Sequence, residues 1–264
     1  MPLVQLADIS LHVIDRGSGT PLVLVHGFPL DHTMWRGQID GLADVCRVIA
    51  PDLRGFGRSG VTAGTVTMAQ FADDLAALLD TLAVMEPVVL CGLSMGGYIA
   101  WQFALRHRRR LSKLILCDTR AIADTPDGAA GRIKTAERVL AEGSSVVAEP
   151  MLGKFFAPAT VSQRPELIEE TRQVILRTAP EGIAAALRGM AERPDVSGRL
   201  ADFDTPALVV GGEHDVISTP SEMHDFTGKM PQARFVKISD AGHMAPLEQP
   251  AAVNQVLRAF LDFV

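Results

Sequence analysis

The pentapeptide Gly92-Leu93-Ser94-Met95-Gly96 decides how the rest of this chain is interpreted. It follows the apolar run Pro87 to Cys91 and precedes a helical pattern from Tyr98 to Arg106. A turn this tight between a strand and a helix forces its central residue into a strained conformation, which only small flanking residues tolerate. The two glycines of the motif, with Gly97 beside them, meet that need. The motif therefore predicts a nucleophilic serine raised above the end of a strand.

Short apolar runs recur along the chain, and each is too short to be a helix. Runs of this kind are typical of strands that are buried on both faces by helices. They fall at Leu22–Val25, Val45–Ala50, Val88–Leu93, Leu114–Cys117, Ala207–Val210 and Phe235–Ile238. Helical patterns lie between several of them, for example at Thr67–Val84, which starts with a T-x-x-Q capping box. The alternation predicts an α/β fold with a mostly parallel, doubly wound sheet, and an antiparallel hairpin is expected at the start of the chain.

One interval, from Thr119 to Asp204, contains no strand-like run. Amphipathic stretches occur there instead, near Ile133–Leu140, Glu166–Thr178 and Ile183–Ala191. The interval is too long for an ordinary loop and too apolar to be disordered, so it needs a surface to cover. We expect a core domain made of residues 1–118 and 205–264, with a helical insertion at residues 119–204.

A serine hydroxyl becomes a good nucleophile only when an imidazole removes its proton, and in this architecture the acid and the histidine follow the serine along the chain. His243 lies after the run Phe235–Ile238 and before the last helical pattern, which suits the base. Asp215 follows the run Ala207–Val210, and its carboxylate would hold one imidazole tautomer. The predicted catalytic residues are therefore Ser94, Asp215 and His243.

Two other carboxylates compete for the role of the acid. Glu213 lies in the same segment, Gly211-Gly212-Glu213-His214-Asp215, and we choose Asp215 over it. Asp118 directly follows the run Leu114–Cys117 and stays open as an alternative, because the chain order allows either position.

Backbone amides are expected to stabilise the oxyanion that forms in the reaction. This architecture takes one N–H from the loop after the third strand and another from the residue after the nucleophile. The corresponding amides are those of Phe28, in His26-Gly27-Phe28-Pro29, and Met95. We interpret His26 as a hydrogen-bonding brace for that loop and not as a second base.

With these motifs in place, the chain strongly resembles the α/β-hydrolase superfamily, in particular its branch of small esterases, enol-lactonases, cofactor-free haloperoxidases and carbon-carbon bond hydrolases. The resemblance spans nearly the whole chain. It rests on HGFP from His26, PDLRGFGRS from Pro51, GLSMGG from Gly92, GEHD from Gly212 and the AGH that ends at His243. A serine at position 94 counts against the related branch in which an aspartate performs dehalogenation or epoxide opening.

The resemblance implies that the helical insertion is a cap over the active site. It also implies that Met151, Phe155, Phe156 and Met190 form part of the substrate pocket. The chemistry it implies needs no cofactor and no metal.

Composition argues against several classes of partner and site. The formal net charge of −6 argues against a nucleic acid, whose phosphates attract Lys and Arg side chains. The three cysteines lie in apolar runs, form no CxxC pair and are expected to be free, which argues against a disulfide framework and a zinc site. The N-terminal segment does not resemble a secretion signal and no segment resembles a membrane span, so we expect a cytoplasmic protein.

The leading hypothesis from the sequence is a carboxylesterase that cleaves small, largely apolar esters through an acyl-enzyme. A lactonase, a perhydrolase or haloperoxidase, and a carbon-carbon bond hydrolase remain open, because the same triad would serve each of them. A hypothesis of another class is a ligand receptor that keeps the triad. The sequence leaves the natural substrate and the oligomeric state undetermined.

Overall fold

The computed structural model describes residues 3–262, and it is built around one eight-stranded sheet. The strand order is β1-β2-β4-β3-β5-β6-β7-β8. The first two strands pair antiparallel, β2 is antiparallel to β4, and every other pair is parallel. The predicted fold class, an α/β fold with a mostly parallel sheet and a helical insertion late in the chain, is therefore confirmed.

The apolar runs correspond to the strands, with small differences at their ends. The strands are β1 Leu3–Gln5, β2 Ser10–Arg16, β3 Pro21–Val25, β4 Arg47–Pro51, β5 Val88–Leu93, β6 Leu111–Cys117, β7 Ala207–Gly212 and β8 Ala233–Ile238. The largest shift is at β6, which begins at Leu111, three residues before the predicted Leu114. Strand β4 begins two residues after the predicted Val45, because Val45 is exposed and lies in the preceding turn. All residues of β3, β5 and β7 are buried, as expected for strands covered on both faces.

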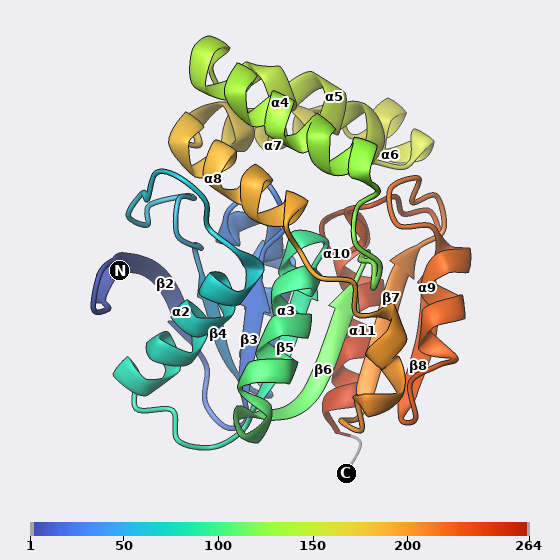
Figure 1. Ribbon diagram of the computed structural model, residues 1–264. Coiled ribbons are helices and arrows are strands. Elements are labelled where there is room, and N and C mark those ends of the chain that lie inside the picture. Colours follow the sequence, from blue (N-terminus) through green and yellow to red (C-terminus); the bar gives the residue numbers. More distant parts are fainter. Residues whose placement is uncertain (1–2, 263–264) are drawn as a thin grey trace.

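Helices of the core domain cover both faces of the sheet. They are α1 Arg36–Leu42, α2 Met68–Thr81, α3 Met95–Arg106, α9 Pro220–Thr227, α10 Ala245–Glu248 and α11 Pro250–Leu261. Helices α2 and α3 pack together on the near face in Figure 1, while α1 and α11 pack together behind the sheet. The predicted cap of α2 is present, since the Gln70 N–H donates to Thr67 Oγ1 at 3.1 Å.

Five helices form a separate layer over one end of the sheet (Figure 1). They are α4 Pro126–Glu142, α5 Ser145–Phe155, α6 Pro158–Gln163, α7 Pro165–Arg177 and α8 Pro180–Ala191. They lie in the chain between β6 and β7, above the carboxyl ends of the parallel strands. Ligands of open α/β sheets bind at this edge, so the layer roofs the expected position of the active site.

The segments that flank this helical layer pack on the core domain. The Trp101 Nε1–H of α3 donates to the Arg120 carbonyl at 3.1 Å, and the Trp101 ring also contacts Phe203. The helical layer itself therefore spans residues 126–191, inside the predicted interval. The domain boundaries at residues 119 and 204 stay predictions.

Two further features bear on the sequence analysis. The three cysteines, Cys46, Cys91 and Cys117, are buried and free, as predicted. Among residues 3–262, no helix combines the length and the apolarity that crossing a bilayer requires.

Candidate active site

Ser94 stands at the turn between β5 and α3 in a strained conformation, with φ 53° and ψ −112°. Such a backbone is rare for a residue with a side chain and is found mostly at functional sites. Hydrogen bonds hold it: the Ser94 N–H donates to the Cys117 carbonyl at 2.9 Å, and Thr119 Oγ1 donates to the Ser94 carbonyl at 2.7 Å. The strand-to-helix turn predicted from the motif is therefore present.

The glycines around Ser94 are required by close contacts. A Cβ atom on Gly92 would lie 2.2 Å from the Gly96 carbonyl oxygen, and one on Gly96 would lie 2.3 Å from the Val25 carbonyl oxygen. Both contacts are with backbone, which cannot move aside as a flexible side chain can. A Cβ atom on Gly97 would lie 2.3 Å from Thr119 Oγ1. These contacts explain physically why the turn needs a small residue on each side of the serine.

The structure brings Asp215 and His243 together. The Nδ1 atom of His243 lies 2.8 Å from Asp215 Oδ2, and both side chains are almost completely buried. Because a carboxylate oxygen can only accept, Nδ1 carries the proton and Nε2 is left as an acceptor. Asp215 is held in turn by the N–H groups of Ile217 and Ser218, which donate to Oδ1 at 2.7 and 3.0 Å. This arrangement fixes the tautomer that a general base needs.

Ser94 and His243 line the same cavity, which has a volume of about 510 Å³ and lies between the core and the helical layer. Residues from α4, α5 and α8 form its roof. Its apolar lining consists of Phe28, Tyr98, Val146, Val147, Pro150, Met151, Leu187, Met190 and Ile217. A volume of this size suits a small organic substrate.

The predicted pocket residues divide into two pairs. Met151 and Met190 line the cavity, as the resemblance implied. Phe155 and Phe156 are not among its lining residues. Phe155 stacks on the His243 ring instead, with the centroids 5.9 Å apart and the planes 19° apart. This phenylalanine therefore supports the ring of the predicted base and does not line the cavity.

The loop that carries His243 is also tied to the helical layer, which the sequence analysis missed. The Met244 N–H donates to the Phe155 carbonyl at 3.2 Å. The buried Glu248 carboxylate accepts the Gly242 N–H at 2.7 Å and the Ala157 N–H at 2.8 Å, so it joins the two segments. No sequence motif indicates these contacts, because residues 155–157 and 242–248 lie far apart in the chain.

The amides of Phe28 and Met95 have the setting expected of oxyanion donors. Phe28 lines the cavity beside Ser94, and Met95 is the first residue of α3, whose N-terminal amides have no acceptor within the helix. Among the described residues, neither amide donates to another protein group. Partial positive charge at this helix end also favours an oxyanion. Their role in the oxyanion hole stays a prediction.

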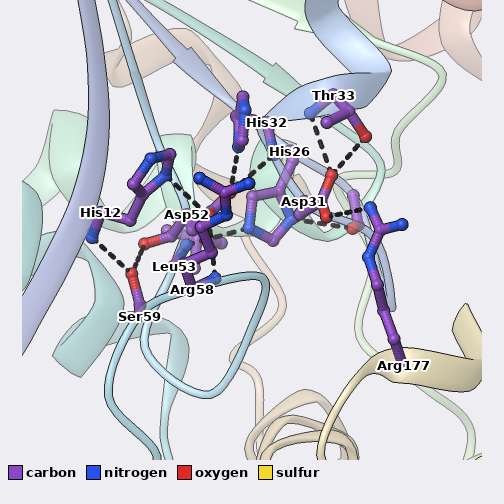
Figure 2. Close-up of polar contacts among 11 residues, drawn as sticks. His12, His26, Asp31, His32, Thr33, Asp52, Leu53, Arg58, Ser59 and Arg177 are labelled. Atoms are coloured by element: carbon purple, nitrogen blue, oxygen red, sulfur yellow. Dashed lines mark hydrogen bonds and ion pairs between the residues drawn. The ribbon is translucent and has the colours of Figure 1, made fainter. Parts of the chain in front are cut away.

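Hydrogen bonds brace the loop that carries Phe28 (Figure 2). His26 Nδ1–H donates to the Gly27 carbonyl at 3.0 Å, while its Nε2 accepts the Leu53 N–H at 2.9 Å. Burial lowers the pKa of His26, which keeps the ring neutral for this double role. The predicted brace is therefore present, and it links the loop after β3 to the loop after β4.

A second brace in Figure 2 is centred on Asp52, which the sequence analysis did not single out. Its Oδ1 accepts the ring and backbone N–H groups of His32, at 2.6 and 2.9 Å. Its Oδ2 accepts the ring N–H of His12 and the backbone N–H of Arg58, each at 3.0 Å. Burial alone would raise the pKa of Asp52, but these hydrogen bonds, led by that of His32, lower it to about 2.

Within the described part of the chain, one group of three residues brings potential metal-ligand atoms together, all within 4.8 Å of one another: His12, His32 and Asp52. Each carboxylate oxygen already accepts two N–H groups, so hydrogen bonding alone accounts for the cluster. The three residues are about twenty positions apart, which is why no ligand spacing was visible in the sequence.

The helical layer also contacts the Phe28 loop directly. Arg177, at the end of α7, donates to the buried Asp31 carboxylate at 2.8 Å (Figure 2), and Thr178 Oγ1 donates to the Pro29 carbonyl at 3.2 Å. The layer is thus attached both to the predicted oxyanion loop and to the loop of the predicted base.

Comparisons with known proteins agree with this geometry. The family model described as alpha/beta hydrolase fold matches residues 20–250. A thermophilic esterase from Thermogutta terrifontis, solved with malate bound, superposes with a TM-score of 0.96 at 49% sequence identity, and the match covers 98% of this chain and 96% of that one.

Enol-lactonases are similar at lower identity. The enol-lactonase from Burkholderia xenovorans LB400 superposes with a TM-score of 0.91 at 29% identity, covering 98% of this chain and 99% of that one. A 3-oxoadipate enol-lactonase from Acinetobacter baylyi is 28% identical over 260 residues, which cover 98% of this chain and 95% of the relative.

Proposed function

The chain belongs to the α/β-hydrolase family, and from this premise we propose that it is a serine carboxylesterase that cleaves small esters through an acyl-enzyme. The observation that carries the proposal is the shared cavity of Ser94 and His243, with the His243 ring held by Asp215. The high similarity to an esterase supports it further.

In the proposed mechanism, His243 Nε2 accepts the proton of the Ser94 hydroxyl while Ser94 Oγ attacks the ester carbonyl. The amides of Phe28 and Met95 donate to the oxyanion of the tetrahedral intermediate. His243 then gives its proton to the departing alcohol, which leaves an acyl-Ser94 ester. A water molecule, deprotonated by His243, attacks this ester and releases the acid and the free serine.

The decisive experiment is the Ser94→Ala substitution, assayed with a 4-nitrophenyl ester of a short acid. Loss of the nucleophile should reduce kcat by roughly 10⁴ to 10⁶. The matched control is Ser162→Ala on α6, because Ser162 is exposed and does not line the cavity. A fluorophosphonate probe should label the wild type and the control but not Ser94→Ala. A Ser94→Ala enzyme that keeps most of its activity contradicts the proposal.

A lactonase is the second candidate, because full-length similarity to enol-lactonases accompanies the similarity to an esterase. A lactone is a cyclic ester, so Ser94 and His243 would play the same parts. A panel of open esters and lactones distinguishes the two: a lactone with a higher kcat/KM than every open ester would assign the lactonase. Turnover without any partner protein would exclude a receptor as the main role.

A further inference from the structure

The charged residues of the active-site cavity are distributed unevenly. Three cationic side chains line it, Arg132 and Arg138 from α4 and Lys154 from α5, whereas Asp124 is the one acidic side chain in the lining. All three cations come from the helical layer, and none comes from the floor that holds Ser94. The whole chain carries a net charge of −6, so this cationic group is a local feature.

Local ion pairs leave part of this positive charge uncompensated. Asp124 is shared by two guanidinium groups, those of Arg132 and the buried Arg193. Burial by itself raises the pKa of Asp124, but the hydrogen bonds from these two arginines lower it overall, so the carboxyl is ionised. One negative charge therefore faces two positive ones. Among the described residues Lys154 has no ion-pair partner, whereas Arg138 is paired with Glu142 on the surface.

Arg132 is held in place, yet it keeps donors for a ligand. Its Nε–H donates to Asp124 Oδ2 and its Nη2 donates to Asp124 Oδ1 at 3.4 Å, which fixes one edge of the guanidinium. Among the described residues, the Met190 sulfur is the one acceptor of its Nη1, at 3.6 Å, and a thioether is a weak acceptor. Asp124 itself is held from behind by Arg193, whose guanidinium lies 4.3 Å from the centre of the Tyr98 ring. An oriented guanidinium of this kind is suited to a carboxylate.

The rest of the cavity wall is apolar, including Val147, Met151, Leu187 and Met190. A ligand that fits both parts has an apolar chain and one anionic end. We propose that the cap half of this cavity is a carboxylate subsite, in which Arg132 and Lys154 bind the free carboxylate of a dicarboxylic acid monoester while Ser94 attacks its ester carbonyl. This inference rests on the proposed esterase function, because it concerns the same cavity.

The test compares two substrates that differ only at the remote end. 4-Nitrophenyl hydrogen pimelate carries a carboxylate there, and 4-nitrophenyl 7-methyloctanoate carries an isopropyl group of similar shape. The wild type should hydrolyse the charged ester with a kcat/KM roughly 10-fold to 100-fold higher, as expected for a hydrogen-bonded charge pair. Esters with other numbers of methylenes give the spacing between the subsite and Ser94.

The variants Arg132→Gln and Lys154→Gln should lose most of this preference, because kcat/KM should fall much further for the charged ester than for the neutral one. Labelling by the fluorophosphonate probe reports whether each variant is correctly folded. Lys134→Gln is the matched control, since Lys134 lies on the same helix, is exposed and does not line the cavity. Raising NaCl from 50 to 500 mM should reduce the preference, because salt screens half-exposed charges.

The outcomes separate this inference from the proposed function. Equal or faster hydrolysis of the neutral ester by the wild type overturns the carboxylate subsite and leaves the esterase intact. An equal loss on both esters in Arg132→Gln shows a structural role for the arginine and also overturns the subsite. No hydrolysis of either ester, together with no fluorophosphonate labelling, overturns the proposed function.

Discussion

The carboxyl ends of β6 and β7 present two similar aspartates in different environments. The two strands pair in parallel, with Cys117 opposite Val210, and each continues into an acidic residue beyond its end. Asp118 follows β6 directly, and Asp215 follows β7 after a short turn. Both side chains are buried, and both belong to the region where the architecture places its acid. Position alone therefore does not distinguish them.

Their hydrogen bonds do distinguish them. The Asp215 carboxylate accepts three N–H groups, from Ile217, Ser218 and the His243 ring. Asp118 Oδ1 accepts only the Gly212 N–H, at 2.7 Å, and within residues 3–262 its Oδ2 has no partner. Burial, followed by the negative charge of Asp215, raises the pKa of Asp118 well above its ordinary value. The pair thus contains a carboxylate that can orient an imidazole and a neighbouring carboxyl that keeps its proton to a higher pH than an ordinary aspartate does.

The comparison indicates that local hydrogen-bond donors favour Asp215 over Asp118 as the proposed acid. A buried carboxylate is stable only where N–H groups compensate for the lost water. The turn after β7 supplies two amides to Asp215 besides the imidazole, whereas Asp118 accepts a single amide, that of Gly212 at the end of β7. Glu213, the third candidate, is half-exposed and forms a surface ion pair with Lys237 at 3.0 Å. It therefore does not share the buried environment of the two aspartates.

Of the substitutions that test this comparison, Asp215→Asn should have the largest effect on catalysis. An asparagine can donate through its side-chain amide, so His243 would turn its Nδ1 into an acceptor and protonate Nε2. The base would then be unable to take the Ser94 proton, and kcat should fall by about 10⁴ with little change in KM. Steady-state kinetics on a 4-nitrophenyl ester measure this effect.

Glu213→Gln is the matched control for that prediction. It removes one carboxylate charge two residues away from Asp215, and the interaction that it removes is the exposed ion pair with Lys237. The free energy of unfolding should therefore change by less than about 1 kcal/mol, and kcat should stay the same. If Asp118→Asn abolished activity while Asp215→Asn did not, the assignment of the two aspartates would be reversed.

The sequence predicted the core of the fold well, because short-range rules determine it. The buried runs at Leu22–Val25 and Val88–Leu93 are apolar throughout, and the glycines around Ser94 leave few alternatives to a strand-turn-helix. The helical layer was predicted less completely: α5 and α6 were missed, since α5 contains Pro150 and α6 has only 6 residues. Its expected boundaries were also wider than the layer of helices.

The candidate site likewise combines residues that local motifs predict with contacts that no local motif predicts. Each predicted catalytic residue lies in a local motif beside the end of a strand, so the sequence could indicate all three. The contacts that hold them are long-range and carry no local signal. Phe155 was expected at the pocket wall but stacks on His243, and Asp52 joins His12 to His32 across forty residues of sequence. Only the folded chain brings such residues together.

A smaller effect is expected for Asp118→Asn, which tests the other half of the comparison. Asparagine resembles a protonated aspartate in shape, and its carbonyl oxygen can still accept the Gly212 N–H. It also tolerates the positive φ of 46° at this position. The variant should therefore change kcat by less than about tenfold, or about 1.4 kcal/mol.

The pH dependence of stability should change more clearly in this variant. The folded state keeps Asp118 protonated at pH values where this residue ionises in the unfolded chain, so the folded state binds one proton more. Because of this group, the free energy of unfolding therefore falls as pH rises from about 4. The slope for one proton is roughly 1.4 kcal/mol per pH unit, and it ends at the folded-state pKa. Removing the titrating group should flatten the profile, so the stability of Asp118→Asn relative to wild type should increase between pH 5 and pH 7.

Guanidinium unfolding of both proteins across this range measures the difference. Parallel profiles would mean that Asp118 is ionised in the folded protein, and the contrast between the two aspartates would then be lost.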